Sequence, residues 1–111
     1  MSINNSYSVI LPTLNEVGHI KSLVLDISRN FNKLNLIYEI IIVDDFSKDN
    51  TKNIIEKINL KNVKFFQNKQ NTNCFGSQRN FGITKATGDY IINVDCDMRG
   101  SKLFLKELDD L

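Results

Sequence analysis

The segment Tyr38-Glu39-Ile40-Ile41-Ile42-Val43-Asp44-Asp45 decides the fold of this chain. Its middle is almost continuous β-branched apolar sequence, which is typical of a central parallel strand covered on both faces. Before it, apolar residues recur at three- and four-residue steps and predict a helix over residues 18–33. After it, a polar loop leads into a second apolar stripe, where Ser47 or Asp49 is placed to cap the helix. The segment is therefore predicted to be a buried strand between two helices.

The rest of the chain repeats this alternation. A short apolar run at residues 7–11 predicts a first strand that ends at Pro12, because proline cannot donate to a sheet ladder. The remaining elements are predicted as a strand at 63–67, a helix over 76–87, a strand at 90–94 and a helix from Ser101. Strands joined by helical crossovers lie parallel, with right-handed connections. We expect an α/β fold with an open, mostly parallel, Rossmann-like sheet, in which four strands alternate with four helices.

Length and composition limit the kind of protein. The chain has 111 residues, which suits a single domain over residues 1–111. Its 41% hydrophobic and 24% charged residues are those of an ordinary soluble globular protein, and a net charge of +1 gives no field that attracts nucleic acid. The first residues predict no signal peptide, and no apolar run approaches the ~20 residues of a membrane helix. We expect a cytoplasmic protein with two free thiols, Cys74 and Cys96, and leave membrane association of a full-length protein open.

Three polar segments follow predicted strands at their carboxyl ends. These are residues 12–16, Asp44-Asp45 and Asp95-Cys96-Asp97. In open parallel sheets, ligands bind beyond the carboxyl ends of the strands, where the strand order reverses. We therefore expect the three segments to meet at one edge of the sheet and to form a ligand site.

The Asp95-Cys96-Asp97 segment suits a divalent metal ion. Mg²⁺ and Mn²⁺ prefer oxygen ligands, and Mg²⁺ is commonly held by one or two carboxylates together with substrate phosphates. Two aspartates on alternate residues are also a common tripeptide, so this pattern alone is a weak signal. Asp44 could accept from a base or ribose donor, whereas Asp45 could equally cap the next helix, and Thr13 or Asn15 the first one.

Arg79 lies on the predicted third helix, near the small residues Gly76, Ser77 and Gly82 that permit close backbone approach. Its planar guanidinium suits a diphosphate or stacking on a base, although an exposed helical arginine is commonly just solvated. His19, the single histidine, has no acidic or nucleophilic partner nearby in the sequence and is predicted to lie on the surface.

The order of these segments resembles glycosyltransferase family 2, inverting enzymes of the GT-A fold that include proteins similar to dolichol-phosphate mannose synthase. Four segments match in order: I-L-P-T-L-N-E at 10–16, Y-E-I-I-I-V-D-D-F-S-K-D-N-T at 38–51, R-N-F-G followed by A-T-G-D-Y-I at 79–91, and Asp95-Cys96-Asp97 in the place of the family's D-x-D. Each motif is common alone. Four in this order and spacing are specific, and they span nearly the whole chain.

The resemblance implies roles for individual residues. The pocket of a nucleoside diphosphate sugar, a UDP- or GDP-sugar, would be lined by Pro12, Thr13, Glu16, Asp44, Asp45, Arg79 and Asp95. Asp95 and Asp97 would hold Mg²⁺ or Mn²⁺, which as a Lewis acid neutralises the charge that develops on the departing diphosphate. The sugar would be transferred to an acceptor with inversion.

Two departures from the family pattern concern the acceptor. The proline expected after the D-x-D of polyprenyl-phosphate enzymes is missing from Met98-Arg99-Gly100-Ser101-Lys102, so a polyprenyl phosphate and a saccharide both stay open as acceptors. No carboxylate of the chain matches the family's catalytic base. We expect a donor-binding half that is truncated before the acceptor-binding half and inactive in transfer by itself.

An alternative is a non-catalytic α/β binding module, such as a receiver-like regulatory domain, because Val43-Asp44-Asp45 resembles the acidic pocket of such proteins. A receiver, however, carries its paired acids after the first strand and needs a later lysine. Dinucleotide enzymes are disfavoured because residues 12–16 contain no glycine. An incomplete sheet exposes apolar surface and an unpaired edge, so we also expect self-association.

Overall fold

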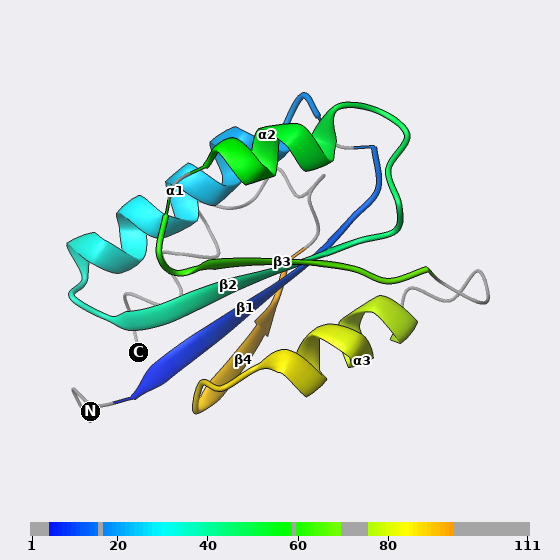
Figure 1. Ribbon diagram of the computed structural model, residues 1–111. Coiled ribbons are helices and arrows are strands. Elements are labelled where there is room, and N and C mark those ends of the chain that lie inside the picture. The colour runs from blue at the N-terminus through cyan, green and yellow to red at the C-terminus, as the bar shows by residue number, and fades with distance from the viewer. Residues whose placement is uncertain (1–4, 16, 59, 70–75, 95–111) are drawn as a thin grey trace.

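The structure, a computed structural model, describes residues 5–15, 17–58, 60–69 and 76–94 (Figure 1). The described elements follow in the order β1 (Ser6–Thr13), α1 (Ile20–Lys33), β2 (Ile37–Asp44), α2 (Thr51–Lys57), β3 (Val63–Gln67), α3 (Gly76–Lys85) and β4 (Tyr90–Asn93). The strands form one parallel sheet in the order β3-β2-β1-β4. The predicted α/β class with a parallel sheet is confirmed, and the helix predicted from Ser101 lies outside the described residues.

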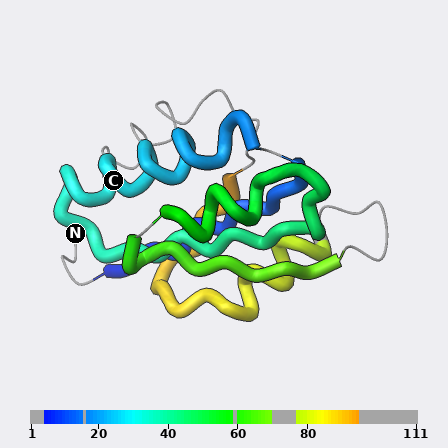
Figure 2. Tube along the Cα trace, turned by 45° about the horizontal axis from the view of Figure 1, so that its top comes forward, coloured from blue at the N-terminus to red at the C-terminus, as the bar shows by residue number. Residues whose placement is uncertain are grey.

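Helices cover both faces of the sheet. α1 and α2 lie on one face and α3 lies on the other, as Figure 1 and Figure 2 show from two directions. The strand order explains this arrangement: the chain steps from β1 to β2 to β3, then returns past them to pair β4 with the far side of β1. Right-handed crossovers taken in opposite directions place their helices on opposite faces.

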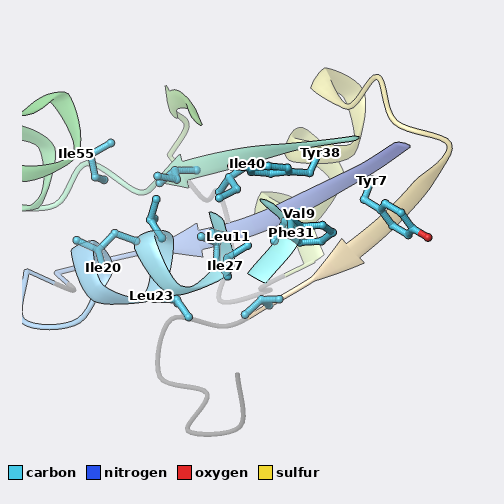
Figure 3. Close-up of a cluster of buried hydrophobic side chains, with 13 residues drawn as sticks. Tyr7, Val9, Leu11, Ile20, Leu23, Ile27, Phe31, Tyr38, Ile40 and Ile55 are labelled. Atoms are coloured by element: carbon cyan, nitrogen blue, oxygen red, sulfur yellow. The ribbon is translucent and has the colours of Figure 1, made fainter. Parts of the chain in front are cut away.

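The larger part of the core lies between the sheet and α1 (Figure 3). The apolar stripe predicted for this helix is buried in full, namely Ile20, Leu23, Val24, Ile27 and Phe31. It packs on alternate side chains of the two central strands, among them Val9, Leu11, Ile40 and Ile42. A smaller cluster on the other face packs against Phe81 of α3 and consists of Ile10, Ile41 and Val43. β2 is thus covered on both faces, as its continuous apolar sequence predicted.

The prediction that the first strand ends at Pro12 is wrong. β1 continues through the proline to Thr13, and Pro12 is in register with Val43 of β2. Successive residues of a strand direct their backbone groups to opposite sides, and Thr13 O accepts from Asp45 N on the β2 side at 2.9 Å. The nitrogen of Pro12 therefore faces the β4 side, where the described pairs end at Ile10. The proline removes no donor from the β1–β2 ladder, so the strand tolerates it.

α3 lies close against the sheet because a glycine stands on its packing face. A Cβ placed on Gly82 would lie 2.5 Å from Ile10 Cγ2 and 3.3 Å from Val43 Cγ2. A larger residue would push the helix away from β1. The helix ends at Lys85 rather than at residue 87, and α1 begins at Ile20 rather than at residue 18. None of the helices in the described ranges has the length and apolarity needed to cross a bilayer.

Candidate functional site

The strand order reverses between β1 and β4. The chain moves outward from β1 through β2 and β3, and β4 then pairs with the opposite side of β1. The carboxyl ends of β1 and β4 therefore flank the position at which open α/β sheets bind ligands. Thr13 ends β1 at this edge, and just after β4 the N–H of Val94 donates to Ile10 O at 3.0 Å. Asp95 follows directly in the sequence.

The loops after β1 and β2 are joined by hydrogen bonds, which we call the loop clamp (Asn15, Val17, Ser47, Lys48 and Asp49). Asn15 Oδ1 accepts from the backbone N–H of Lys48 at 2.8 Å. The Asn15 N–H donates to Ser47 Oγ at 2.8 Å, and the Val17 N–H donates to Asp49 Oδ2 at 3.3 Å. Because these contacts run in both directions between the loops, the two loops form one connected surface.

Two residues of these loops have a left-handed backbone conformation, Asn15 with a φ of 53° and Phe46 with a φ of 51°. Asparagine adopts this region more readily than most residues, whereas a bulky phenylalanine does so at an energetic cost. Such conformations persist where neighbouring contacts fix them, and they are concentrated at functional sites. Here the fixing contacts come from the loop clamp and from Asp44.

Asp44 lies at the centre of this arrangement. The residue is buried. Its Oδ2 accepts from the Ser47 N–H at 2.9 Å, and its Oδ1 accepts from the Ser47 hydroxyl. Its backbone carbonyl accepts from the Asn68 N–H at 2.9 Å, which ties the end of β3 to the same edge. The carboxylate thus orders the loop that follows β2.

The side chains predicted as helix caps make other contacts. Asp49 accepts from the backbone N–H of Thr51 at 3.0 Å and from the Thr51 hydroxyl, at the first residue of α2, whereas the N-cap residue is Asn50 and makes no side-chain cap bond. The hydroxyl contact is the main cause that lowers the pKa of the Asp49 carboxyl. Ser47, the other candidate, bonds to Asp44 instead. Asn15 does not cap α1, because its side chain bonds to the loop after β2 and α1 has no side-chain cap.

A pair of amides attaches the start of α3 to the end of β3. Asn68 Nδ2 donates to Gln78 Oε1 at 2.8 Å, and Gln78 Nε2 donates to Asn68 O at 2.6 Å. Gln78 is buried, so this exchange satisfies its amide inside the fold. The next residue, Arg79, is exposed, and none of the ion pairs in the described chain includes it. Its guanidinium stands on a fixed helix and is available to an anion.

The structure places part of the predicted site at the carboxyl edge. Four of the predicted residues lie there together, at the ends of β1 and β2: Pro12, Thr13, Asp44 and Asp45. Arg79 lies on α3, which covers the opposite face from α1. His19 is exposed, as predicted. The remaining predicted site residues, Glu16, Asp95 and Asp97, lie outside the described part of the chain. Both cysteines also lie outside it.

Sequence reasoning missed the residues that connect the loops. The sequence predicts Asn15, Ser47 and Asp49 as possible helix caps, but all three bond across the loops, and Ser47 also bonds to Asp44. The polar S-x-D-x-T pattern after Asp44-Asp45 carries a signal for hydrogen bonding, but it does not identify the partner. Gln78 carried no signal, because its partner depends on where β3 ends.

The structure describes only part of the edge at which a metal ion is predicted. Within the described ranges, no group of three or more His, Cys, Asp or Glu residues gathers to hold an ion. Asp44, the buried acid of the edge, is already bonded to Ser47. Asp95 and Asp97, the predicted ligands of Mg²⁺ or Mn²⁺, follow β4 in the sequence and lie outside the described residues.

Comparison with known proteins gives the family context. Residues 8–108 match the family model described as glycosyl transferase family 2. The chain is 35% identical over 103 residues to the poly(ribitol-phosphate) beta-N-acetylglucosaminyltransferase TarS of Staphylococcus aureus, covering 91% of this chain and 18% of TarS. It is 37% identical over 105 residues to a dolichyl-phosphate beta-glucosyltransferase of Dictyostelium discoideum, covering 86% of this chain and 32% of that protein. The chain thus spans less than a third of the length of either relative.

Solved structures agree with this match. The crystal structure of S. aureus TarS in complex with UDP-GlcNAc superposes with a TM-score of 0.72 at 31% identity, covering 95% of this chain and 31% of that chain. A mannosyltransferase from Pyrobaculum calidifontis in complex with GDP-Man and Mn²⁺ has a TM-score of 0.71 at 19% identity, covering 92% of this chain and 31% of that one. At that lower identity the likeness concerns the fold alone.

Proposed function

Because this chain belongs to glycosyl transferase family 2, we propose that it is the donor-binding part of an inverting glycosyltransferase that uses a UDP- or GDP-sugar. Its fold is of the GT-A type. The observation that carries the proposal is the carboxyl edge, where the loop clamp joins two loops around buried Asp44 beside the reversal of strand order. Family membership displaces the alternative of a receiver-like module.

The nucleoside is assigned to the surface that the ends of β1 and β2 form. Pro12 and Thr13 supply one side of it, and Asp44 and Asp45 supply the other. Each oxygen of the Asp44 carboxylate accepts one hydrogen bond from Ser47, so we assign Asp44 first to shaping this surface; its remaining lone pairs could accept from a base N–H. Arg79 is assigned to the diphosphate, because its guanidinium presents a planar fork of donors that matches phosphate oxygens.

The metal is assigned to Asp95 and Asp97, together with oxygens of the donor diphosphate. A divalent ion there would stabilise the negative charge that develops on the diphosphate as the sugar departs. The position of these residues after β4 supports the assignment, since β1 and β4 flank the reversal of strand order. Mn²⁺ is bound in the structure of a different protein, the mannosyltransferase. We use that complex only to choose the ion for the test.

The donor and acceptor classes follow from the relatives. TarS in its crystal structure binds UDP-GlcNAc, and at 31% identity this makes a UDP-sugar the first donor to test. The relatives are named for two acceptor chemistries, a poly(ribitol-phosphate) and a dolichyl phosphate. The dolichyl-phosphate relative keeps a polyprenyl phosphate among the proposed acceptor classes, and a saccharide stays beside it as the second class expected from the sequence.

Calorimetry tests the proposal directly. UDP-GlcNAc and GDP-mannose are titrated into the protein with Mn²⁺ and again with EDTA. We expect one nucleotide sugar to bind with Mn²⁺ and to lose at least tenfold in affinity in EDTA and in the Asp97→Asn variant. Asp26→Asn, a matched change on the half-exposed side of α1, should bind like the wild type. Absence of binding by both nucleotide sugars in the presence of Mn²⁺ would refute the proposal.

A further inference from the structure

A buried carboxylate lies at the amino edge of the sheet, at the opposite end from the proposed donor site. Glu39 belongs to β2, is 7% exposed, and lies roughly 16 Å before Asp44 along the strand. Its Oε2 accepts from the Ser8 hydroxyl at 2.6 Å, from the Thr87 N–H at 2.6 Å and from the Thr87 hydroxyl at 3.0 Å. Its Oε1 accepts from Lys64 Nζ at 2.7 Å. Both oxygens of this buried group are therefore bonded.

The Glu39 carboxyl is ionised inside the fold. Burial alone would raise its pKa, but the Lys64 ammonium and the hydrogen bonds from Ser8 and Thr87 outweigh burial and lower the pKa to about 2. Hydrogen bonds to an ionised acceptor are stronger than those between neutral groups. Glu39 therefore holds the connection between α3 and β4 firmly to β1 and β2.

Further hydrogen bonds hold the two residues directly before β4. The Gly88 N–H donates to Ser8 Oγ at 2.8 Å. The Asp89 N–H donates to Ser6 Oγ at 3.2 Å, and the Ser6 N–H donates to Asp89 Oδ2 at 3.0 Å. We call this set the β4 latch; its members are Ser6, Ser8, Glu39, Thr87, Gly88 and Asp89. It fixes three consecutive residues of the connection against the sheet.

The chain approaches β1 so closely at the latch that only glycine fits. A Cβ placed on Gly88 would lie 2.7 Å from Ser8 Oγ and 2.8 Å from the Ser8 backbone nitrogen. Both distances are shorter than van der Waals contact, and the second involves backbone that cannot rotate away. The latch therefore admits one position of the connection relative to β1.

The β4 latch adds to a small number of other contacts that set the register of β4. The strand is four residues long, pairs with β1 alone in the described sheet, and is exposed at Tyr90, Ile91 and Asn93. Its other contacts are the stacking of Tyr90 on Tyr7 and the packing of Ile92 and Val94 against the core. Register is less strongly specified in a short strand that is largely exposed. A slip of one residue would move everything after β4 by about 3.3 Å and reverse the faces of its side chains. A fixed point before β4 therefore matters for whatever follows it.

We propose that Glu39 is a positioning residue for the donor site, acting through the β4 latch to set the register of β4 and so the position of Val94, which directly precedes Asp95-Cys96-Asp97 in the sequence. This inference rests on the proposed function for its consequence, since those aspartates are the assigned metal ligands. Its mechanical part concerns β4 alone.

Hydrogen exchange tests the mechanical part without a ligand. Glu39→Gln keeps the shape of the side chain and removes its charge, and Ser8→Ala removes the acceptor of the Gly88 N–H in case the first variant unfolds. We expect the amides of Ile92 and Val94 to exchange at least tenfold faster in either variant. The amides of Ile40 and Asn68, which bond between β2 and β3, should change less. Glu56→Gln, the same change in an exposed ion pair on α2, should leave the exchange of all four amides unchanged.

Nucleotide binding tests the consequence. UDP is titrated with Mn²⁺ under conditions in which circular dichroism shows each variant to be folded, and we expect at least a fivefold loss of affinity in Glu39→Gln and Ser8→Ala but not in Glu56→Gln. Equal acceleration of exchange across the whole sheet, or unchanged affinity in variants with a loosened β4, would overturn the inference. Failure of wild-type protein to bind UDP would overturn the proposed function, while the exchange data would still decide whether the latch fixes β4.

Discussion

Replacing Asn15 by alanine and by glycine separates two contributions of this residue to the loop clamp. Its side-chain oxygen accepts from the Lys48 N–H at 2.8 Å, and its backbone has a φ of 53°. Both variants lose the hydrogen bond. Alanine must also adopt a left-handed conformation, which glycine reaches without steric cost.

The magnitudes follow from these two differences. A lost hydrogen bond at an exposed loop costs about 1 kcal/mol. The left-handed conformation adds about 1–2 kcal/mol for alanine. Glycine adds up to about 1 kcal/mol through the greater freedom of the unfolded chain. We expect Asn15→Ala to lose about 2–3 kcal/mol of unfolding free energy and Asn15→Gly about 1–2 kcal/mol.

Urea unfolding followed by circular dichroism measures the difference, since the chain has no tryptophan for fluorescence. With a urea dependence of about 1–2 kcal/mol/M, the two midpoints should differ by roughly 0.5–1 M. Asn35 is the matched control: its φ is 56°, and it lies outside the loop clamp. Asn35→Gly should therefore cost less than Asn15→Gly. Equal midpoints for both Asn15 variants would refute the strain argument, and wild-type midpoints for both would refute the clamp.

Three further predictions concern stability and association. The pKa of Glu39 is lowered from 4.5 to about 2 on folding, so its contribution, on the order of 3 kcal/mol, is present above its unfolded pKa and is lost as the pH falls toward 2. The difference in unfolding free energy between wild type and Glu39→Gln should shrink from pH 7 to pH 3, and a constant difference would contradict this. Gly88→Ala should cost about 1–3 kcal/mol in thermal or urea unfolding, whereas Gly18→Ala, where a Cβ meets nothing within 4 Å, should be near neutral; equal effects would contradict the close approach. β4 is an edge strand of the described sheet and exposes Ile91, so we expect concentration-dependent self-association that Ile91→Lys reduces; sedimentation of the wild type as a monomer at all concentrations would count against it.

The sequence was informative where one physical signal dominates. The sequence predicted both β2 and α1. A strand buried on both faces is apolar throughout, as β2 is, and a helix buried on one face has apolar residues every three or four positions, as α1 has. The bounds of β3 were predicted residue for residue. Pro12 was misjudged, because its effect depends on which side its nitrogen faces and on where β4 stops pairing, and neither is written in the local sequence.

The candidate site was predictable as a location and less so as a set of contacts. The predicted strand ends located the site at the carboxyl edge, since the carboxyl ends of parallel strands lie at the same edge of the sheet. The partners of Asn15 and Glu39 come from distant parts of the chain, Lys48 in one case and Thr87 in the other. Local patterns show that such side chains can form hydrogen bonds, but only the folded backbone decides with which partner.

Paramagnetic broadening by Mn²⁺ tests the central claim most directly, because it reports both binding and place. Mn²⁺ is titrated into isotopically labelled protein saturated with UDP, and the amide signals at the two ends of the sheet are compared. Eight-residue strands such as β1 and β2 separate these ends by roughly 25 Å. We predict that Asp45 and Ser47 at the carboxyl edge lose intensity while Thr87 and Asp89 at the amino edge keep theirs. Uniform intensities, or losses confined to the amino edge, would contradict a metal-dependent donor site at the carboxyl ends of the strands.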